Sequence, residues 1–389
     1  MGDILNEPTK NKEVLKMKGN VTVVLDSQAG SCGKGKFVGY LAKHDNFTAA
    51  IDNFMSNAGH TYRDDDYGIV MTQHLPTSIV NPTTNLYIGP GAAITPSILF
   101  NEILKYRDII GGRKVYINPR AMVIKPEHAE REKELIRSGS TFKGCGVAQA
   151  DKVMRVPGTQ LFGEWYKYED WSGGYTPEEI NCIIDTIEVD DCMMLLNNMI
   201  DCGESVLVEG SQGCDLDINY GLNYPHTTSR QCHAGQLVAD CGISPRLVDD
   251  IIMIMRPYPI RISNQTNIGL EISSGDYDGS EELTWDIIKE RCGAPDDAQF
   301  GEMTTVTKKM RRVFEMNWDR LRYVTTLNRP TQIALNFAQY IDYGALGCKK
   351  WSELPQKVKD FIARVEDVTN VKVTLIGTGA ANDEIIDRR

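Results

Sequence analysis

A glycine-rich loop near the start of the chain carries the residue types best suited to chemistry. It reads Gly30-Ser31-Cys32-Gly33-Lys34-Gly35-Lys36. Its glycines allow the backbone to approach a ligand closely, and its lysines supply positive charge. The loop departs from the Walker pattern, because Gln28 stands at the first glycine position and Gly35 at the Ser/Thr position. These residues indicate a phosphate-binding loop, and the alternative is a flexible, solvated loop.

Three further polar segments could join this loop in one site. Asn57-Ala58-Gly59-His60-Thr61 contains a histidine that can exchange a proton near neutral pH. Glu209-Gly210-Ser211-Gln212-Gly213 ends an apolar run, and Pro225-His226-Thr227-Thr228-Ser229 contributes hydroxyl groups. Hydroxyl and amide groups suit the recognition of a nucleotide base or phosphate. Taken singly, each segment is also compatible with a structural role, because the same residue types form turns and helix caps.

The elements on either side of the loop must position it. Val21-Thr22-Val23-Val24-Leu25 is a β-branched run typical of a strand buried on both faces of a parallel sheet. After the loop, Phe37, Tyr40 and Leu41 recur at helical spacing. The loop therefore lies between a strand and a helix, where backbone N–H groups can face an anion.

The rest of the chain alternates strand and helix patterns. This alternation predicts an α/β fold with a mostly parallel central sheet flanked by helices. The stretch 127–201 is mainly helical in pattern and indicates a helical insertion. We expect a polar N-terminal extension over 1–19 and a single domain over 20–389. Further strands are predicted at Ile69–Met71, Leu86–Ile88, Lys114–Ile117, Ser205–Glu209, Ile251–Met255, Gln332–Leu335 and Lys372–Ile376.

Composition narrows the class of protein. The 389 residues include 42 basic and 53 acidic side chains, and the net charge of −11 argues against binding to nucleic-acid polymer or anionic membrane. The cluster 308–312 is basic although the chain as a whole is negatively charged. It could bind phosphate or carboxylate groups, or it could be a solvated face. The ten cysteines form no CxxC pair, which indicates reduced thiols. With no apolar run of membrane-spanning length, a cytoplasmic protein is expected.

Taken in order, these segments resemble the motifs of the adenylosuccinate synthetase family. Its members join aspartate to the 6-position of a purine nucleotide, using a nucleoside triphosphate. The family motifs GDEGKGK, NAGHT and EGAQG correspond to Gly30–Lys36, Asn57–Thr61 and Glu209–Gly213. Further family-like segments are Gly139–Gly146, Asp151–Arg155, Pro225–Ser229, Thr304–Arg312 and Gly377–Gly379. The resemblance implies a P-loop-like nucleotide ligase architecture with helical insertions.

The resemblance also implies a mechanism and a set of site residues. The γ-phosphoryl group would move to the purine 6-oxygen, and the aspartate amine would then displace it. Ser31, His60 and Lys34 occupy the catalytic positions, and Ser31 and Gly59 occupy the positions that ligate Mg²⁺, the implied cofactor. The triphosphate would contact Gly33, Lys34, Gly35, Lys36, Gly59, His60, Thr61, Gln339, Gly377, Thr378 and Gly379.

The same resemblance assigns the two other substrates. The purine monophosphate would contact Ser31, Asn57, Ser140, Thr141, Arg155, Gln212 and Thr228. Aspartate would contact Thr304, Thr305, Thr307, Lys309 and Arg311. Arg155 matches an arginine that the family donates across a homodimer interface, which implies that the chain forms a homodimer.

One departure from the family lies at Ser31, where the family has an aspartate that accepts the N1 proton of the hypoxanthine ring and can ligate Mg²⁺. Serine is shorter and can still form a hydrogen bond. A purine with a 2-amino group beside N1 would crowd against the family carboxylate. The combination resembles the phage branch of the family, the 2-aminoadenylosuccinate synthetases, which use dGMP. If the chain is encoded by a phage, the host cytoplasm is its expected location.

Two more departures affect the triphosphate and aspartate sites. Where the family motif TKLD specifies guanine through its aspartate, this chain reads Asn336-Phe337-Ala338-Gln339. A neutral glutamine would tolerate adenine, so ATP or dATP is expected in place of GTP. Lys309 replaces a family arginine and keeps the charge without the bidentate geometry.

Three functions remain open from the sequence. The first is a carbon–nitrogen ligase that forms 2-amino-2'-deoxyadenylosuccinate from dGMP, L-aspartate and ATP or dATP. The second is an ordinary adenylosuccinate synthetase that uses IMP and GTP. The third is an inactive nucleotide-binding regulator that has lost its base at Ser31.

Overall fold

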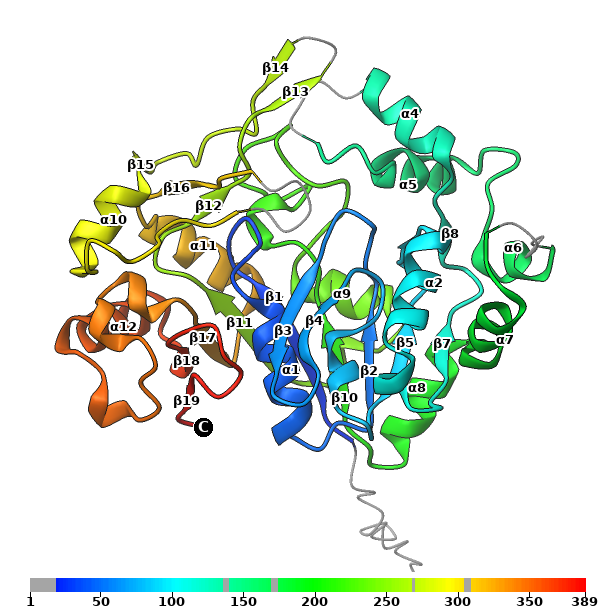
Figure 1. Ribbon diagram of the computed structural model, residues 1–389, viewed down its shortest axis with the longest axis horizontal. Coiled ribbons are helices and arrows are strands. Elements are labelled where there is room, and N and C mark those ends of the chain that lie inside the picture. The colour runs from blue at the N-terminus through cyan, green and yellow to red at the C-terminus, as the bar shows by residue number, and fades with distance from the viewer. Residues whose placement is uncertain (1–18, 136–139, 169–173, 268–269, 304–308) are drawn as a thin grey trace, which may run out of the picture.

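A ten-stranded sheet forms the centre of the molecule (Figure 1). The computed structural model describes residues 19–135, 140–168, 174–267, 270–303 and 309–389. The strand order is β19-β18-β17-β11-β1-β10-β2-β5-β7-β9, and every neighbouring pair is parallel except β18 and β19. This arrangement confirms the predicted α/β class with a mostly parallel sheet.

The strands of this sheet are short. They are β1 (Val21–Asp26), β2 (Ala49–Asp52), β5 (Asn85–Ile88), β7 (Val115–Ile117), β9 (Ile187–Val189), β10 (Val206–Glu209), β11 (Val248–Met255), β17 (Gln332–Leu335), β18 (Val373–Gly377) and β19 (Ile385–Asp387). Smaller sheets are formed by β3 (His60–Asp64) with β4 (Gly68–Thr72), by β6 (Ala93–Ile94) with β8 (Met122–Val123), by β12 (Ile260–Arg261), β15 (Glu282–Leu283) and β16 (Arg312–Phe314), and by β13 (Gln265–Asn267) with β14 (Leu270–Ile272).

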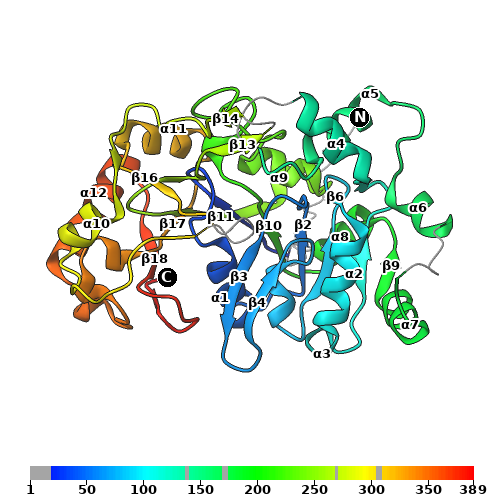
Figure 2. The ribbon, with the colours of Figure 1, turned by 45° about the horizontal axis from the view of Figure 1, so that its top comes forward.

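Helices cover both faces of the sheet (Figures 1 and 2). They are α1 (Lys34–His44), α2 (Pro96–Lys105), α3 (Arg107–Ile110), α4 (Pro126–Leu135), α5 (Cys145–Met154), α6 (Phe162–Tyr168), α7 (Pro177–Thr186), α8 (Cys192–Asp201), α9 (Ala234–Asp240), α10 (Trp285–Cys292), α11 (Trp318–Asn328) and α12 (Gln356–Thr369). No helix within the described ranges is long and apolar enough to cross a membrane.

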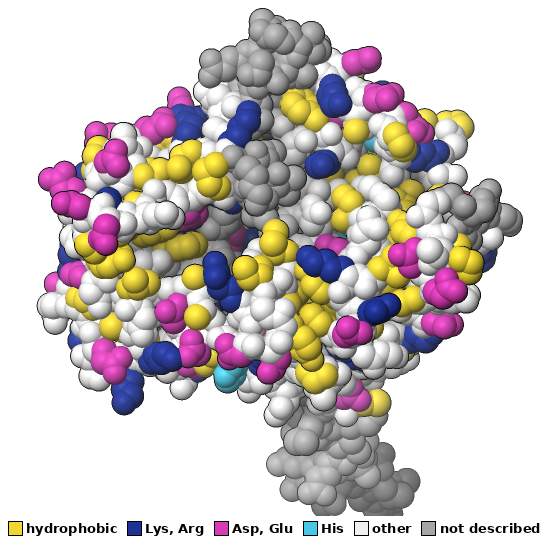
Figure 3. All heavy atoms as spheres, viewed as in Figure 1, with side chains coloured by type: hydrophobic (Ala, Val, Ile, Leu, Met, Phe, Trp, Pro, Cys, Tyr) yellow, Lys and Arg dark blue, Asp and Glu magenta, His cyan; other side chains and the backbone are white. Residues whose placement is uncertain are grey.

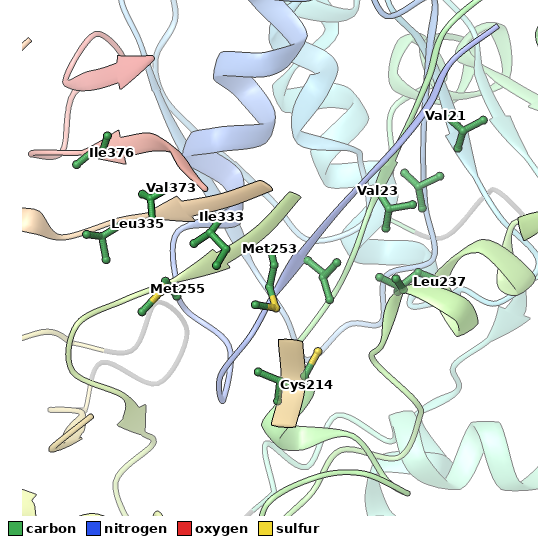
Figure 4. Close-up of a cluster of buried hydrophobic side chains, with 14 of the residues drawn as sticks. Val21, Val23, Cys214, Leu237, Met253, Met255, Ile333, Leu335, Val373 and Ile376 are labelled. Carbon is green, nitrogen blue, oxygen red and sulfur yellow. The ribbon is translucent and has the colours of Figure 1, made fainter. Parts of the chain in front are cut away.

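The alternation of side chains along β1 explains why the sheet is covered on both sides. Val21 and Val23 point to one face, where they pack with residues of α8, α9, α11 and α12. Val24 points to the other face and packs against α1. Figure 4 shows the first of these clusters, in which Leu237 of α9 lies beside β1 and Met253 comes from the neighbouring β11. Every residue of β1 is buried, as expected for a central strand of a parallel sheet.

Most of the predicted strands lie in this sheet, but one does not. Ile69–Met71 falls in β4, which pairs with β3 in a separate antiparallel hairpin. The prediction placed a strand there correctly, yet local pattern carries no information about the sheet that a strand joins. The stretch 127–201 holds α4 to α8 and also β9, which pairs with β7 at the edge of the central sheet. Residues 1–18 of the predicted extension lie outside the described residues.

Candidate functional site

A cleft of about 1170 Å³ opens where the central strands end at their carboxyl termini. Its lining comes from the loop after β1, from β3, from the loop after β10, and from segments before α5 and after β12. In parallel α/β sheets, ligands bind at this edge, because the loops from neighbouring strands meet there. Figure 3 looks onto this part of the molecule, which is hollowed near its centre with Lys and Arg side chains around the hollow.

The predicted phosphate loop lies at the N-terminus of α1. Gly33 caps the helix with φ +97°, and Gly33, Lys34 and Gly35 all line the cleft. A Cβ at residue 33 would lie 2.0 Å from Asn336 Nδ2, so only glycine fits there. Asn336 Nδ2 also donates to the carbonyl of Cys32 at 3.0 Å. The loop is therefore held from the end of β17, with its N–H groups at the positive end of a helix.

The two lysines of the loop make different contacts. Lys34 Nζ lies in the cleft wall and donates to Asp26 Oδ2 at 2.6 Å and to the carbonyl of Gln212 at 2.5 Å. Lys36 Nζ instead donates to the carbonyls of Gly379 and Glu384 at 2.7 and 2.8 Å. Burial lowers the pKa of Lys36 to about 8. Lys36 is not among the residues that line the cleft, so it ties the loop to the C-terminal segment.

Ser31 sits at the tip of the loop and is held by two arginines. Its hydroxyl accepts a hydrogen bond from Arg311 Nη1 at 2.6 Å, and its carbonyl accepts one from Arg256 Nη1 at 3.1 Å. Arg256 is fully buried and pairs with Glu302. Burial alone would raise the pKa of Glu302, but the charge and hydrogen bond of Arg256, together with Arg311 and Tyr340, hold that pKa below its usual value. Ser31 itself has φ +54°, a left-handed conformation uncommon for serine.

His60 begins β3 and faces a buried carboxylate. Its Nδ1 lies 2.7 Å from Glu209 Oε1, at the end of β10. Glu209 is held in turn by Thr77, whose backbone N–H donates to Oε2 at 2.8 Å and whose hydroxyl donates to Oε1 at 2.7 Å. A proton on Nδ1 bonded to Glu209 fixes the orientation of the imidazole, so Nε2 remains for a ligand.

Most residues predicted to hold the purine monophosphate line this one cleft. They are Ser31, Asn57, Ser140, Thr141, Gln212 and Thr228. Gln212 Nε2 donates to Asn57 Oδ1 at 3.3 Å, which joins two of the sequence motifs. Arg155 does not line the cleft. It is exposed at the end of α5, beside Val153 and Met154, which are 69% and 72% exposed.

The residues predicted to hold aspartate are only partly described. Thr304, Thr305 and Thr307 lie outside the described residues. Arg311 lines the cleft, where burial lowers its pKa, whereas Lys309 is exposed and is not part of the lining. The structure thus brings one of the two described residues to the cleft.

Only some of the residues predicted to hold the triphosphate line the cleft. Gly33, Lys34, Gly35, Gly59, His60 and Thr61 line the cleft, whereas Lys36, Gln339, Gly377, Thr378 and Gly379 do not. Gly377 packs against Asn336, and Thr378 Oγ1 donates to the carbonyl of Cys348 at 2.7 Å. Gln339 is half-buried, and its Oε1 has no hydrogen-bond partner within the described chain.

The cleft wall offers oxygen atoms that suit Mg²⁺. Asp26 Oδ1 is buried and accepts no hydrogen bond from the part of the chain that the structure describes. Asp26 and Gly59 both line the cleft. Mg²⁺ is usually held by one or two carboxylates together with substrate phosphates. Asp26 and the Gly59 carbonyl fit that pattern, whereas Ser31 fits less well, because the Arg311 cation occupies its hydroxyl.

Sequence reasoning missed several residues of this site. Asp26, Arg256, Glu302 and Asn336 were assigned no role, although Asp26 directly follows the predicted first strand, which is a signal for a site residue in a parallel sheet. Glu209 belongs to a motif that was identified, but its contact with His60 was not foreseen. No local pattern points to Arg256 or Glu302, which reach the loop from distant parts of the chain.

Comparison with known proteins identifies a family. The chain matches the adenylosuccinate synthetase family over residues 23–168 and 177–345. An N6-succino-2-amino-2'-deoxyadenylate synthase of Salmonella phage PMBT28 is 32% identical over 327 residues, covering 82% of this chain and 86% of the relative. An adenylosuccinate synthetase of Thermococcus sibiricus is 30% identical over 376 residues, covering 94% and 98%. The two kinds of relative are similarly distant in sequence.

A solved structure gives the same picture of the fold. The succinoaminodeoxyadenylate synthetase of cyanophage S-2L, bound to dGMP and to dATP as an energy donor, matches with a TM-score of 0.77 and 27% identity. The match covers 95% of this chain and 96% of the other. These similarities confirm the family resemblance that the motifs indicated.

Proposed function

This chain belongs to the adenylosuccinate synthetase family of carbon–nitrogen ligases, and on that premise we propose that it joins L-aspartate to the 6-position of dGMP. ATP or dATP would drive the reaction and leave as ADP or dADP, with release of phosphate. The product would be 2-amino-2'-deoxyadenylosuccinate. The dGMP-using phage relatives support this substrate, and they also favour the host cytoplasm as the place of action.

The observation that carries the proposal is the short side chain at the tip of the phosphate loop. Ser31 lines the cleft together with the residues expected to hold the monophosphate. A carboxylate there would extend further into the cleft than the serine hydroxyl, which already contacts Arg311. A purine with a 2-amino group beside N1 needs that additional room.

The arrangement of the cleft suits a phosphoryl transfer followed by a displacement. In the first step the 6-oxygen of the purine attacks the γ-phosphorus, the bond to the β-phosphate oxygen breaks, and the N1 proton of the purine passes to solvent. His60, with both ring nitrogens protonated and its Nδ1–H held by Glu209, would donate a hydrogen bond from Nε2 to the oxygen on which charge develops. In the second step the aspartate amine adds at C6, the bond between C6 and the phosphate oxygen breaks, and the phosphate leaves with the proton that the amine loses. Arg311 would orient the aspartate carboxylates.

Asp26 and the Gly59 carbonyl would hold Mg²⁺, whose charge would stabilise the phosphate oxygens during transfer. The α1 N-terminus would bind phosphate beside it, through the backbone N–H groups of Gly33 to Gly35. Lys34 would add its charge while Asp26 keeps it in place.

We further propose that adenine is the base of the triphosphate. Residues 336–339, directly after β17, carry the amides of Asn336 and Gln339 but no carboxylate, so no anion there would accept from both the N1–H and the 2-amino group of guanine. Amide groups can donate and accept, as the edge of adenine requires. The dATP of the cyanophage structure supports this assignment.

A homodimer with Arg155 reaching the neighbouring cleft is the proposed assembly. The exposed Val153 and Met154 beside Arg155 favour a protein contact at this position. We expect the Arg155→Ala and His60→Ala variants each to be inactive alone and to regain about a quarter of the wild-type activity when mixed, because half of the dimers would then contain one complete site. Turnover of the mixture in an assay for phosphate release measures this. A mixture that shows exchange of subunits by native mass spectrometry but no activity would contradict the proposal.

The proposed reaction is tested by product analysis. Purified protein is incubated with dGMP, L-aspartate, Mg²⁺ and ATP. The nucleotides are then separated, and their masses are measured by mass spectrometry. We expect a product with the mass of 2-amino-2'-deoxyadenylosuccinate, formed in equal amount with ADP. Conversion of IMP with GTP, without conversion of dGMP, would instead make the chain an ordinary adenylosuccinate synthetase. Nucleotide binding without any phosphate release would make it a regulator.

A further inference from the structure

Arg63 lies in the middle of β3 and differs from the other cations of the cleft. Lys34, Arg63, Arg261 and Arg311 are the lysines and arginines that line it within the described ranges. Lys34 pairs with Asp26, Arg261 donates to the carbonyls of His226 and Ser274, and Arg311 contacts Ser31 and Glu302. Arg63 alone among these four has no hydrogen bond or ion pair to the part of the chain that the structure describes.

The β3–β4 hairpin sets the direction of the Arg63 side chain. Residues alternate along β3, so that Tyr62 and Asp64 are buried while Thr61 and Arg63 are exposed on the opposite face. Tyr62 packs over Gly39 of α1, which fixes the buried side of the hairpin. Thr61 and Arg63 both line the cleft. Arg63 therefore extends the surface that Thr61 begins, whereas His60 lies on the buried side of β3 and reaches the cleft at the start of the strand.

Neighbouring contacts place Arg63 at one end of the cleft. The backbone of Thr61 lies against Gly35 of the phosphate loop, and the Tyr62 hydroxyl forms a hydrogen bond with Asn382. Figures 1 and 2 show the hairpin beside α1 and next to the loop that joins β18 to β19. This is the region where the phosphate loop meets the C-terminal segment, as the contact of Lys36 with Gly379 also shows.

We propose that Arg63 binds the phosphates of the nucleoside triphosphate that are not transferred. Successive residues of a strand rise about 3.3 Å, so Arg63 lies about 7 Å beyond Thr61 along β3. If Thr61 contacts the γ-phosphate, as the family resemblance implies for this residue and as the proposed function is built on, Arg63 reaches the α- and β-phosphates. A guanidinium group without a protein partner is suited to a polyphosphate, because it offers two parallel N–H donors to phosphate oxygens.

The position of Arg63 predicts the kind of effect that its removal has. The charge on the α-phosphate changes little during transfer of the γ-phosphoryl group, so a contact of Arg63 there is similar before and during transfer. An interaction of this kind stabilises the bound substrate and the transition state equally, so its loss raises KM and leaves kcat nearly unchanged. The expected rise in KM for ATP in Arg63→Ala is roughly 10- to 100-fold, as for loss of a hydrogen bond to a charged group.

Kinetics with the three substrates varied in turn test this proposal. In Arg63→Ala we expect a raised KM for ATP or dATP, with KM for dGMP and for aspartate within about twofold of wild type. Arg63→Lys should fall between the two proteins, because the charge remains and the paired donors do not. Ile69→Ala is the matched control, since Ile69 is the cross-strand partner of Arg63 and is 53% exposed. It should leave every KM unchanged.

A binding measurement separates this proposal from the proposed function. Calorimetric titration of ATP into each variant with Mg²⁺, without monophosphate or aspartate, needs no turnover of dGMP. A loss of ATP affinity in Arg63→Ala, absent from Ile69→Ala, supports the role of Arg63 whichever purine the enzyme uses. Equal ATP affinity in wild type and Arg63→Ala would overturn it, as would a rise in KM for dGMP alone.

Discussion

Replacement of His60 by alanine is expected to lower kcat about 10²- to 10⁴-fold, the usual contribution of a positioned proton donor. The imidazole lies in the cleft wall with Nδ1 against Glu209, so that Nε2 is the group available to the reacting oxygen. The contact strengthens as charge develops, so its loss falls on kcat more than on KM. Steady-state turnover of dGMP, together with calorimetric binding of ATP and dGMP, measures the two effects separately.

The Glu209→Gln variant is a useful companion to His60→Ala. Glutamine keeps the shape of Glu209 and the hydrogen bond from Thr77, but it removes the carboxylate that faces Nδ1. We expect a loss of kcat smaller than that of His60→Ala, because the neutral amide holds the imidazole less firmly than the carboxylate does. Unchanged turnover in His60→Ala would return this histidine to a structural role.

The substitution Ser31→Asp is expected to impair the use of dGMP far more than the use of dIMP. The larger anion would fill the room beside the 2-amino group of dGMP, which dIMP lacks. It would also form an ion pair with Arg311, whose Nη1 lies 2.6 Å from the serine hydroxyl. We expect kcat/KM for dGMP to fall at least about 10-fold more than kcat/KM for dIMP, as clashes of one to three kcal/mol produce. Competition assays with both nucleotides in one reaction measure the ratio directly.

Two further variants separate the causes at this position. Ser31→Ala keeps the room and loses only the hydroxyl, so the preference for dGMP should persist. Ser31→Asn introduces a side chain of the size of aspartate without its charge. If the size of the side chain determines the preference for dGMP over dIMP, Ser31→Asn should reduce that preference as Ser31→Asp does. If Ser31→Asp lowered kcat/KM equally for dGMP and dIMP, Ser31 would not determine which purine the enzyme prefers.

The parts of the site that lie close together in sequence could be predicted. β1, the phosphate loop and α1 follow one another within 24 positions, from Val21 to His44, and their local pattern alone indicates a strand, a glycine-rich turn and a helix. The contact of His60 with Glu209 spans 149 positions, and that of Ser31 with Arg311 spans 280. Such contacts depend on the order of strands in the sheet, which the periodicity of a single strand does not contain.

Helix geometry explains why the two lysines of the loop point in different directions. Lys34 and Lys36 are two residues apart in α1, which places their side chains about 200° apart around the helix axis. When Lys34 faces the cleft, Lys36 must point away from it, toward Gly379. Asp26, by contrast, is a residue of the cleft that the sequence analysis did not identify, although its place at the end of β1 is typical of a site residue. The family resemblance drew attention to the loop instead.

The ratio of kcat/KM for dGMP to kcat/KM for dIMP, measured on the wild-type protein, tests the central claim most directly. The two nucleotides differ only in the 2-amino group, so the ratio reports what the cleft around Ser31 does with that group. With ATP, Mg²⁺ and L-aspartate held constant, we predict a preference for dGMP of at least about 10-fold, equivalent to about 1.4 kcal/mol of transition-state stabilisation. A ratio at or below one would contradict the assignment of dGMP as the substrate.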